Sequence, residues 1–461
     1  MTEPQAAKSK FPATFWTANT IELFERAAYY AMASFMVIYL KETLGMSPQT
    51  ATFLNGSILW GLIYFLPILS GTLADKFGFR RSLVAAMILI SAGYVSVYGG
   101  HVVPPGSVYA IVILGIVLIG MGGSVVKPCI AGTVQKTAGT RATLAFGIFY
   151  MVINIGSLTG RGIAYYVRTS LQKIPSIFIV SAVFALLGLA VVLFLYREPE
   201  FVSDGRKDGQ VVRKRTLGEA VMGIFIVLGN LKFVFLIIVL AMFWFLYIQL
   251  YNLMPLYIRF VDPNAAMDLY TMANPAMIVL FQIPITRFVK RQTPLRSIML
   301  GAIVVTLGML VNALPALLSA DPAKKVSALG LGLPIAGVFM LVSIASMAVG
   351  EMMASPRIYE YIGAIAPRGQ EGLYLGYQSL PIALASIVGG PLGGRLFERY
   401  INTPLKEGRP VDTLTMWFII VGIGVATVHM GYHHAVDPLG GYLWGTLCFA
   451  AGLRWLKRRG E

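Results

Sequence analysis

Long apolar stretches alternate with short polar connections along most of the chain, from about residue 15 to residue 434. Each stretch holds about 20 residues or more, the length an α-helix needs to cross the hydrocarbon core of a bilayer. Strands of a transmembrane barrel would be about half as long and would alternate in polarity. The pattern predicts twelve membrane-spanning helices, at residues 15–40, 50–74, 80–100, 107–135, 142–168, 176–196, 231–258, 267–288, 295–318, 328–362, 372–398 and 414–434.

A polar stretch divides these twelve helices into two groups of six. Its sequence, REPEFVSDGRKDGQVVRKR, has the composition of a linker and is too short to hold two further spans. We therefore predict an all-α membrane protein with an N-terminal six-helix bundle at 1–196, a cytoplasmic linker at 197–219 and a C-terminal six-helix bundle at 220–461. Two equal halves are typical of transporters that hold their substrate where the halves meet.

Composition and charge agree with this membrane assignment. Hydrophobic residues make up 57% of the 461 positions and charged residues only 13%, too apolar a balance for a soluble protein. The net charge of +16 comes largely from the tails, the linker and the loops after even-numbered spans. The positive-inside rule then places both termini in the cytoplasm of a multi-pass inner-membrane protein. Basic residues in loops on the other side, such as Arg168, Lys325 and Arg409, reduce the difference in positive charge between the two sides.

The two ends of the chain raise separate questions. The first span has no small-residue cleavage site and carries charges at its centre, so we interpret it as a retained helix rather than a signal peptide. For residues 438–456 we prefer an interfacial helix over a thirteenth span, which would be short and would place a basic end outside. Cys129 and Cys448 lie far apart in the chain and predict neither a disulfide framework nor a metal site.

The first span contains three charges within five residues, in the sequence ELFERAAYY at 22–30. Helical periodicity places Glu22, Glu25, Arg26 and Tyr29 on one face. A lone charge at the bilayer centre costs at least about 2.5 kcal/mol, so this face must contact protein or water. An ion pair between Arg26 and Glu22 would leave the second acid without a partner, and such a carboxylate in a low-dielectric site binds protons more readily. We therefore favour a proton-coupling site over a purely structural pair.

Three further charges lie within predicted spans. Lys127 in GMGGSVVKPCIAG and Glu351 in VGEMMASPRIYEY stand at similar distances from the starts of their spans, one in each bundle. A Lys127–Glu351 pair would lock the halves together when the inner side is closed; alternatively, each is satisfied within its own bundle. Arg161 in INIGSLTGRG either points into the cavity or snorkels toward the outer face, and the residues do not decide between these.

Several motifs resemble those of a known family. GTLADKFGFRRS at 71–82 resembles the loop motif of the major facilitator superfamily. ELFERAAYY resembles the E-x-x-E-R-F-x-Y-Y signature of its proton-dependent oligopeptide transporters, and FYMVINIGSL at 149–158 resembles their F-Y-x-x-I-N-x-G-S-L signature. Weaker matches include YFLPILSGTLAD, KPCIAG, NPAMIVLFQIP and GEMMASP. The resemblance implies the major facilitator fold, with twelve helices in two six-helix bundles.

The resemblance also implies roles for particular residues. Proton coupling would involve Glu22, Glu25, Arg26, Lys127 and Glu351. Lys127 would contact the carboxylate of a peptide, and Glu351 would receive its amino group. The residues implied or predicted to bind the substrate are Tyr29, Tyr30, Tyr64, Lys127, Asn154, Arg161, Gln249, Asn274 and Glu351.

The sequence departs from the family pattern at two charged positions. Ile248 stands before Gln249 where the bacterial transporters usually carry an acid, and Arg161 stands where the pattern is usually uncharged. The predicted cavity then has three acids and three bases, which makes it more positive than the family pattern. This motivates an alternative cargo, a small and more anionic peptide-like solute that is imported or exported.

We expect a proton-coupled symporter of di- and tripeptides that works by alternating access, and not an enzyme. Ser157 and Ser355 have no nearby histidine base, and the histidines form no ligand constellation. No catalytic residue, metal or cofactor is predicted. The expected partners are the peptide, protons and membrane lipid, with no nucleic acid, and the expected oligomeric state is a monomer.

Overall fold

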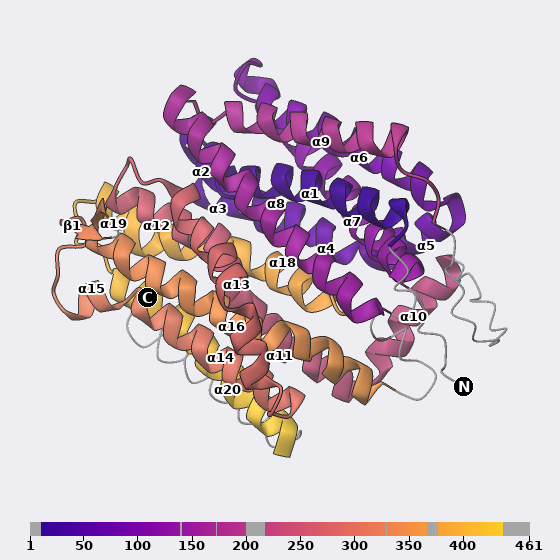
Figure 1. Cartoon of the computed structure of the whole chain (residues 1–461). Helices are drawn as coiled ribbons and strands as arrows, with labels where there is room; N and C mark the ends of the chain where they lie inside the picture. The colour runs from indigo at the N-terminus through magenta and orange to yellow at the C-terminus, as the bar shows by residue number, and fades with distance from the viewer. Residues whose placement is uncertain are drawn as a thin grey trace, which may run out of the picture.

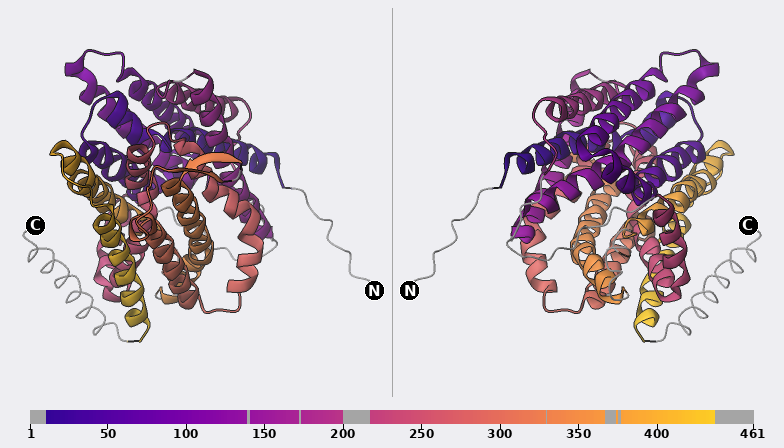
Figure 2. Two further views of the ribbon diagram at one scale, coloured as in Figure 1. Left: turned by 90° about the vertical axis from the view of Figure 1, so that its left-hand side faces the viewer. Right: turned by 90° about the vertical axis from the view of Figure 1, so that its right-hand side faces the viewer.

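Two groups of helices lie side by side in Figure 1, one from the chain before residue 200 and the other from the chain after residue 216. The computed structural model describes residues 11–138, 141–171, 173–199, 217–328, 330–366, 374 and 377–436. The predicted tail helix at 438–456 and most of the predicted linker lie outside the described residues. Figure 2 shows from two sides that helices of the first half occupy one part of the molecule and those of the second half the other.

The N-terminal bundle contains the first six spans. Several of them change helix type along their length, and the second is divided into four consecutive segments. Its helices are α1 (Ala13–Ala33), α2 (Met36–Ile38), η1 (Tyr39–Thr43), α3 (Pro48–Thr52), η2 (Phe53–Trp60), α4 (Gly61–Phe65), α5 (Pro67–Phe77), α6 (Phe79–Gly99), η3 (Pro105–Ser107), α7 (Val108–Ala138), α8 (Ala142–Leu171) and α9 (Ser176–Phe194).

The C-terminal bundle contains the other six spans, together with a short helix before them. Its helices are α10 (Leu217–Gly229), α11 (Leu231–Ile248), η5 (Gln249–Tyr251), α12 (Leu253–Val261), α13 (Met267–Val289), α14 (Pro294–Val311), α15 (Leu314–Leu317), α16 (Ile335–Ile365), α18 (Leu380–Phe397), η6 (Glu398–Asn402), α19 (Thr403–Lys406) and α20 (Thr413–Val436).

A helix lies within each of the twelve predicted spans. Most bounds shift by only a few residues, but α18, in the eleventh, begins at Leu380, eight residues after the predicted start at 372. Eleven of the described helical segments are long and apolar enough to cross a membrane, and α1, with its three charges, is the twelfth. The predicted start of the tenth span at residue 328 is wrong. Strands β1 (Lys325–Ala328) and β2 (Leu331–Pro334) pair there as an antiparallel hairpin, and α16 begins only at Ile335.

The loop motif at 71–82 is fastened to the end of the sixth span. Gly78 adopts a φ of 89°, a left-handed conformation that glycine tolerates, and this turn separates α5 from α6. The carboxylate of Glu198 accepts hydrogen bonds from the backbone N–H groups of Phe79 (2.7 Å) and Arg80 (3.0 Å). A carboxylate at a helix N-terminus satisfies free N–H groups and complements the helix dipole. The Arg80 guanidinium also donates to the Leu193 carbonyl (2.8 Å).

The long helices define two ends of the molecule. We call the end with Gly78 and residues 197–199 the linker end, and the opposite end, with the 44–47 loop and the β1–β2 hairpin, the far end. Figure 1 shows α5 and α10 at the linker end and α12, α15, α19 and β1 at the far end. This axis orders the inter-bundle contacts.

Polar contacts between the bundles gather in the far half. Ser34 hydrogen bonds to Thr271 (2.8 Å between the oxygens), and the Asn55 amide donates to the Tyr251 carbonyl and to Asn252 Oδ1 (3.2 Å each). Two ion pairs join the same halves: Arg259 with Glu42, and Arg168 with the buried Asp268. The far end is therefore held closed by contacts from several helices.

Two spans also approach closely enough for their backbones to touch. A Cβ placed on Gly390 of α18 would lie 2.3 Å from the Thr52 carbonyl oxygen and 2.9 Å from the Gly56 Cα. Gly394, one turn later, faces Thr52 and Pro48 in the same way. Small residues at this spacing allow close packing of membrane helices. The sequence SIVGGPLGGRL thus brings α18 against α3 and η2 at the far end.

Candidate functional site

The charged face of α1 is buried within the N-terminal bundle. Glu22, Glu25 and Arg26 are 0%, 2% and 2% exposed. The Arg26 guanidinium contacts the Glu25 carboxylate directly, and its Nε lies 3.4 Å from Glu22 Oε1. Neither Glu22 oxygen has a hydrogen-bond partner among the described residues. The i+4 pairing of Arg26 with Glu22 is thus the weaker contact, and Glu22, not Glu25, is the acid without a full partner.

Glycines of α8 bring that helix against the cluster. A Cβ on Gly156 would lie 2.8 Å from the Arg26 Cβ, and one on Gly160 would lie 2.2 Å from the Ala27 carbonyl oxygen. Larger residues would push α8 away from α1. The close approach leaves little room for water around Arg26, so the ion pairs form in a low-dielectric environment, where charges interact strongly.

Lys127 and Glu351 come from different bundles and remain partly accessible, unlike the α1 cluster. Lys127 Nζ lies 5.4 Å from the centre of the Tyr64 ring, and Glu351 Oε2 accepts a hydrogen bond from Asn274 (3.2 Å). Among the described residues, no salt bridge joins Lys127 to Glu351. The far end of the molecule is closed in this state. The predicted pair would belong to a state in which the linker end is closed, and its existence stays a prediction.

Aromatic side chains from three spans form a wall beside these charges, with Arg26 over the Tyr29 ring and Lys127 over the Tyr64 ring. Trp60 of η2 packs against Tyr29, Tyr64 and Tyr251, with ring centroids 6.0, 5.6 and 4.9 Å away. Tyr30 stands edge-on to Tyr29 (5.2 Å) and is partly accessible. The predicted tyrosines of both spans therefore share one wall.

Asn154 and Gln249 occupy different settings. Asn154 is buried on α8, where its amide donates to the Tyr150 carbonyl (2.9 Å). Gln249 is fully buried, and its amide donates to the carbonyls of Phe245 and Gly389 (3.2 Å each). These contacts of Gln249 hold α11 to α18 inside the C-terminal bundle, so the structure does not bring Gln249 together with the other predicted residues.

Arg161 lies at the bundle interface and is fully buried, so the snorkelling alternative is wrong. Its guanidinium contacts Ser157 of the preceding turn, donates to the Tyr251 hydroxyl (2.8 Å) and stacks over the Tyr30 ring at 4.4 Å. Ser157 and Tyr30 belong to the same bundle as Arg161, and Tyr251 belongs to the other bundle.

Sequence reasoning missed Tyr247 and Tyr251. They stand four residues apart on the seventh span, which gives them one helical face. Tyr247 donates toward Asn274 Oδ1 (3.4 Å), and Tyr251 receives Arg161. The i, i+4 spacing in YIQLY was the available signal, and it was obscured because most neighbouring residues are also large and apolar.

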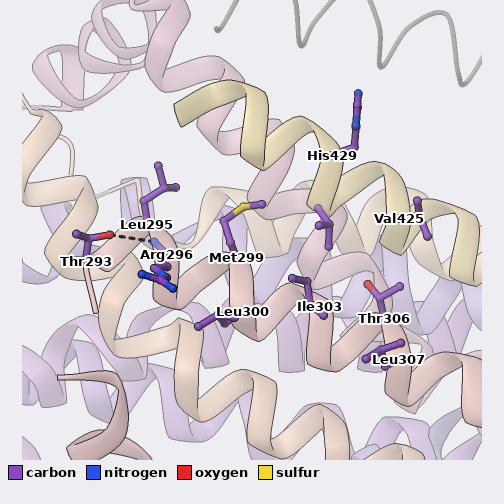
Figure 3. Close-up of a pocket in the computed structure, with 11 residues that line it drawn as sticks. Thr293, Leu295, Arg296, Met299, Leu300, Ile303, Thr306, Leu307, Val425 and His429 are labelled. Carbon is purple, nitrogen blue, oxygen red and sulfur yellow. Dashed lines mark hydrogen bonds between the residues drawn. The ribbon is translucent and has the colours of Figure 1, made fainter. Parts of the chain in front are cut away.

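A groove on the C-terminal bundle lies apart from this site. It has a volume of about 810 Å³ and lies between α14 and α20, where Met299, Ile303 and Val425 supply apolar walls. Figure 3 shows Arg296 near the first turn of α14, with the apolar side chains following along the helix. None of the predicted site residues lines it, so it is not a candidate for the coupled site.

Comparisons with known proteins agree with the fold and with the motifs. The family profile described as Major Facilitator Superfamily matches residues 21–322. The chain belongs to the Major Facilitator Superfamily.

Relatives and solved structures narrow the similarity within this superfamily. The chain is 33% identical over 153 residues to dipeptide and tripeptide permease A of Pectobacterium carotovorum, an alignment covering 32% of this chain and 29% of the relative. The permease of the same name from Salmonella typhi is also 33% identical over 153 residues. The alignment thus spans less than a third of the length of these curated relatives.

Two solved structures match nearly the whole fold. One is a peptide transporter POT in complex with sulfate, with a TM-score of 0.69, 20% identity and coverage of 94% of this chain and 96% of that one. The other is a POT family transporter in complex with 5-aminolevulinic acid, with a TM-score of 0.71, 18% identity and coverage of 94% and 98%. The matching relatives are named dipeptide and tripeptide permeases, and the matching structures are named POT transporters. The predicted resemblance to the proton-dependent oligopeptide transporters is thus confirmed.

Proposed function

We propose that this protein is a proton-coupled symporter of di- and tripeptides that works by alternating access. The observation that carries the proposal is the arrangement of charges between the bundles. A buried acid–base cluster on α1 lies in the same bundle as the partly accessible Lys127, while Glu351 and Asn274 come from the other bundle. A peptide carries a carboxylate and an amino group, so Lys127 and Glu351 have the charges to hold its two ends.

The mechanism would use Glu22 as the proton site. Arg26 contacts Glu25 more closely than Glu22, and neither Glu22 oxygen accepts a hydrogen bond among the described residues. Protonation of Glu22 would therefore break fewer bonds than protonation of Glu25. The moving units would be the bundles at 1–196 and 220–461, and the far-end contacts would break when the cavity opens on that side. Tyr29, Tyr30, Tyr64 and Asn154 would then form the N-terminal wall of the peptide site.

Replacing Glu22 with glutamine is expected to abolish proton-driven accumulation of labelled dialanine in proteoliposomes while leaving exchange across the membrane. Glutamine keeps the shape of the side chain but cannot take up a proton. The measurement is substrate-dependent proton flux and uptake under an inward proton gradient. Glu407→Gln, which changes an exposed far-end acid, is the matched control and should behave as the native protein. Unchanged coupling in Glu22→Gln would eliminate the role assigned to this carboxylate, and no peptide uptake or exchange by the native protein would eliminate the function.

The membrane setting is part of the proposal. Basic residues that softened the charge contrast at the far end have acidic partners: Arg168 with Asp268, Lys325 with Asp262 (3.8 Å), and Arg409 with Glu407. This supports an inner-membrane topology with both termini in the cytoplasm. We expect a monomer in contact with membrane lipid. Accessibility of single cysteines placed at each end would test the topology.

A second cargo class is favoured by one observation. Arg161 adds a buried cation, and Ile248 supplies no acid to balance it. A small anionic solute that is not a peptide would suit such a cavity. Thermal stabilisation by dicarboxylates that exceeds stabilisation by dialanine would support this candidate over the peptide.

A further inference from the structure

Arg161 is a buried cation without a carboxylate partner in the part of the chain that the structure describes. It is 0% exposed, its Nη2 donates to the Tyr251 hydroxyl (2.8 Å), and its Nη1 is directed at Ser157. Its Nε–H has no hydrogen-bond partner within the described ranges. A buried guanidinium that bonds only neutral groups is poorly compensated, because hydroxyls and a ring face replace hydration only in part.

The acids around it are engaged elsewhere. Glu22 and Glu25 share Arg26, and Glu351 accepts from Asn274, although Glu351 lies near enough to interact electrostatically with Arg161. On the seventh span, the residue one turn before Tyr251 is Ile248. Among the described residues, no carboxylate bonds directly to the Arg161 guanidinium.

The unsatisfied edge of Arg161 has the geometry that binds carboxylates. Nε and Nη2 lie on the same side of a guanidinium and together make the bidentate fork for a carboxylate. Two other inter-bundle arginines in this chain use that same fork: Arg168 holds both oxygens of Asp268, and Arg259 holds both oxygens of Glu42. In Arg161, Nη2 donates to a tyrosine hydroxyl, and Nε has no hydrogen-bond partner among the described residues.

That hydroxyl belongs to the opposite bundle. Arg161 and Ser157 lie on α8, whereas Tyr251 lies on η5. Opening of the far end separates the bundles, so the bond between Arg161 and Tyr251 would break in that state. The whole fork would then face the passage, held in place by Ser157 and Tyr30 on its own bundle.

We propose that Arg161 is a specificity-determining residue that binds an acidic group of the substrate when the far end is open. The preferred cargo would be peptides with an aspartate or glutamate side chain, whose second carboxylate Arg161 holds while Lys127 holds the terminal one. On closure of the far end, Tyr251 takes one prong of the fork and helps to release the acidic group. The inference rests on the peptide symport proposed above and narrows its substrate class.

The test compares alanyl-glutamate with alanyl-glutamine, which have nearly the same shape and differ in charge. We expect native protein in proteoliposomes to take up alanyl-glutamate with an apparent affinity at least about tenfold higher, as for a charge-assisted bidentate pair. Arg161→Gln should bring the ratio of the two apparent affinities to about one, and thermal unfolding of the purified variant checks that it is folded. Arg161→Lys, which keeps the charge and loses the fork, should retain only part of the preference.

Tyr251→Phe provides the matched control, because it removes the hydroxyl and leaves the guanidinium. It should change transport rates and keep the preference for the acidic peptide. Equal handling of both peptides by the native protein, or an undiminished preference in a folded Arg161→Gln protein, would overturn the inference and leave peptide symport standing. Failure to transport dialanine or either of these peptides would instead refute the proposed function together with this inference.

Discussion

Gly390→Val is expected to prevent the far end from closing and to lower uptake of labelled dipeptide by about tenfold to a hundredfold. The added side chain would start from a Cβ only 2.3 Å from the Thr52 carbonyl oxygen and 2.9 Å from the Gly56 Cα, and neither backbone group can move aside without separating the spans. Overpacking of this kind costs about 1–3 kcal/mol, and each 1.4 kcal/mol shifts an equilibrium about tenfold. Uptake assays in proteoliposomes measure the effect.

The variant Gly422→Val is the control, because a Cβ at Gly422 on α20 meets nothing within 4 Å. Its uptake should stay close to that of the native protein. A cysteine introduced at Asn55, which is buried between the bundles at the far end, should react faster with a maleimide in the Gly390→Val background. Native rates of both uptake and labelling in Gly390→Val would show that this contact does not form the closure.

Arg26→Gln is expected to cause the largest loss of stability, together with loss of transport. Removing the guanidinium leaves two buried carboxylates, Glu22 and Glu25, without their shared cation. Breaking a buried ion pair by removing one partner typically costs about 3–5 kcal/mol. Thermal unfolding of the purified protein in detergent should show a clear decrease in the midpoint relative to the native protein.

A second substitution distinguishes this electrostatic cause from a simple packing defect. The double variant Arg26→Gln with Glu25→Gln removes the acid that the guanidinium contacts most closely, so it should unfold at a higher temperature than Arg26→Gln alone. If the double variant unfolds at a lower temperature than Arg26→Gln alone, the pair of Arg26 and Glu25 does not stabilise the cluster. Neither variant is expected to couple peptide uptake to protons.

The sequence predicted the spans well because lipid imposes one dominant rule, that every spanning backbone group must be satisfied within a helix. The hairpin at 325–334 was missed because Val326, Leu331 and Leu333 extend the apolar run that leads into α16. Hydrophobicity alone does not reveal where that run changes from strand to helix. The polar face of α1 was predicted correctly for the opposite reason, since charge in an apolar helix is rare and its period is fixed.

Partners across the bundle interface could not be predicted in the same way. Arg168 and Asp268 are 100 residues apart, and their pairing depends on how α8 meets α13. Likewise, nothing in the local sequence of Arg161 identifies Tyr251 as its partner. Helical periodicity shows which face of its own helix a residue occupies, but not which other helix packs against that face. The acid closest to Arg26 was also misjudged, because i+1 and i+4 contacts depend on the rotamer chosen.

The carboxylate of Glu198 fastens the chain after the sixth span to the start of α6 through the backbone N–H groups of Phe79 and Arg80. Loss of this carboxylate would leave two N–H groups at the N-terminus of α6 without that acceptor. Movement of the residues that follow the sixth span would therefore be passed directly to the turn between α5 and α6.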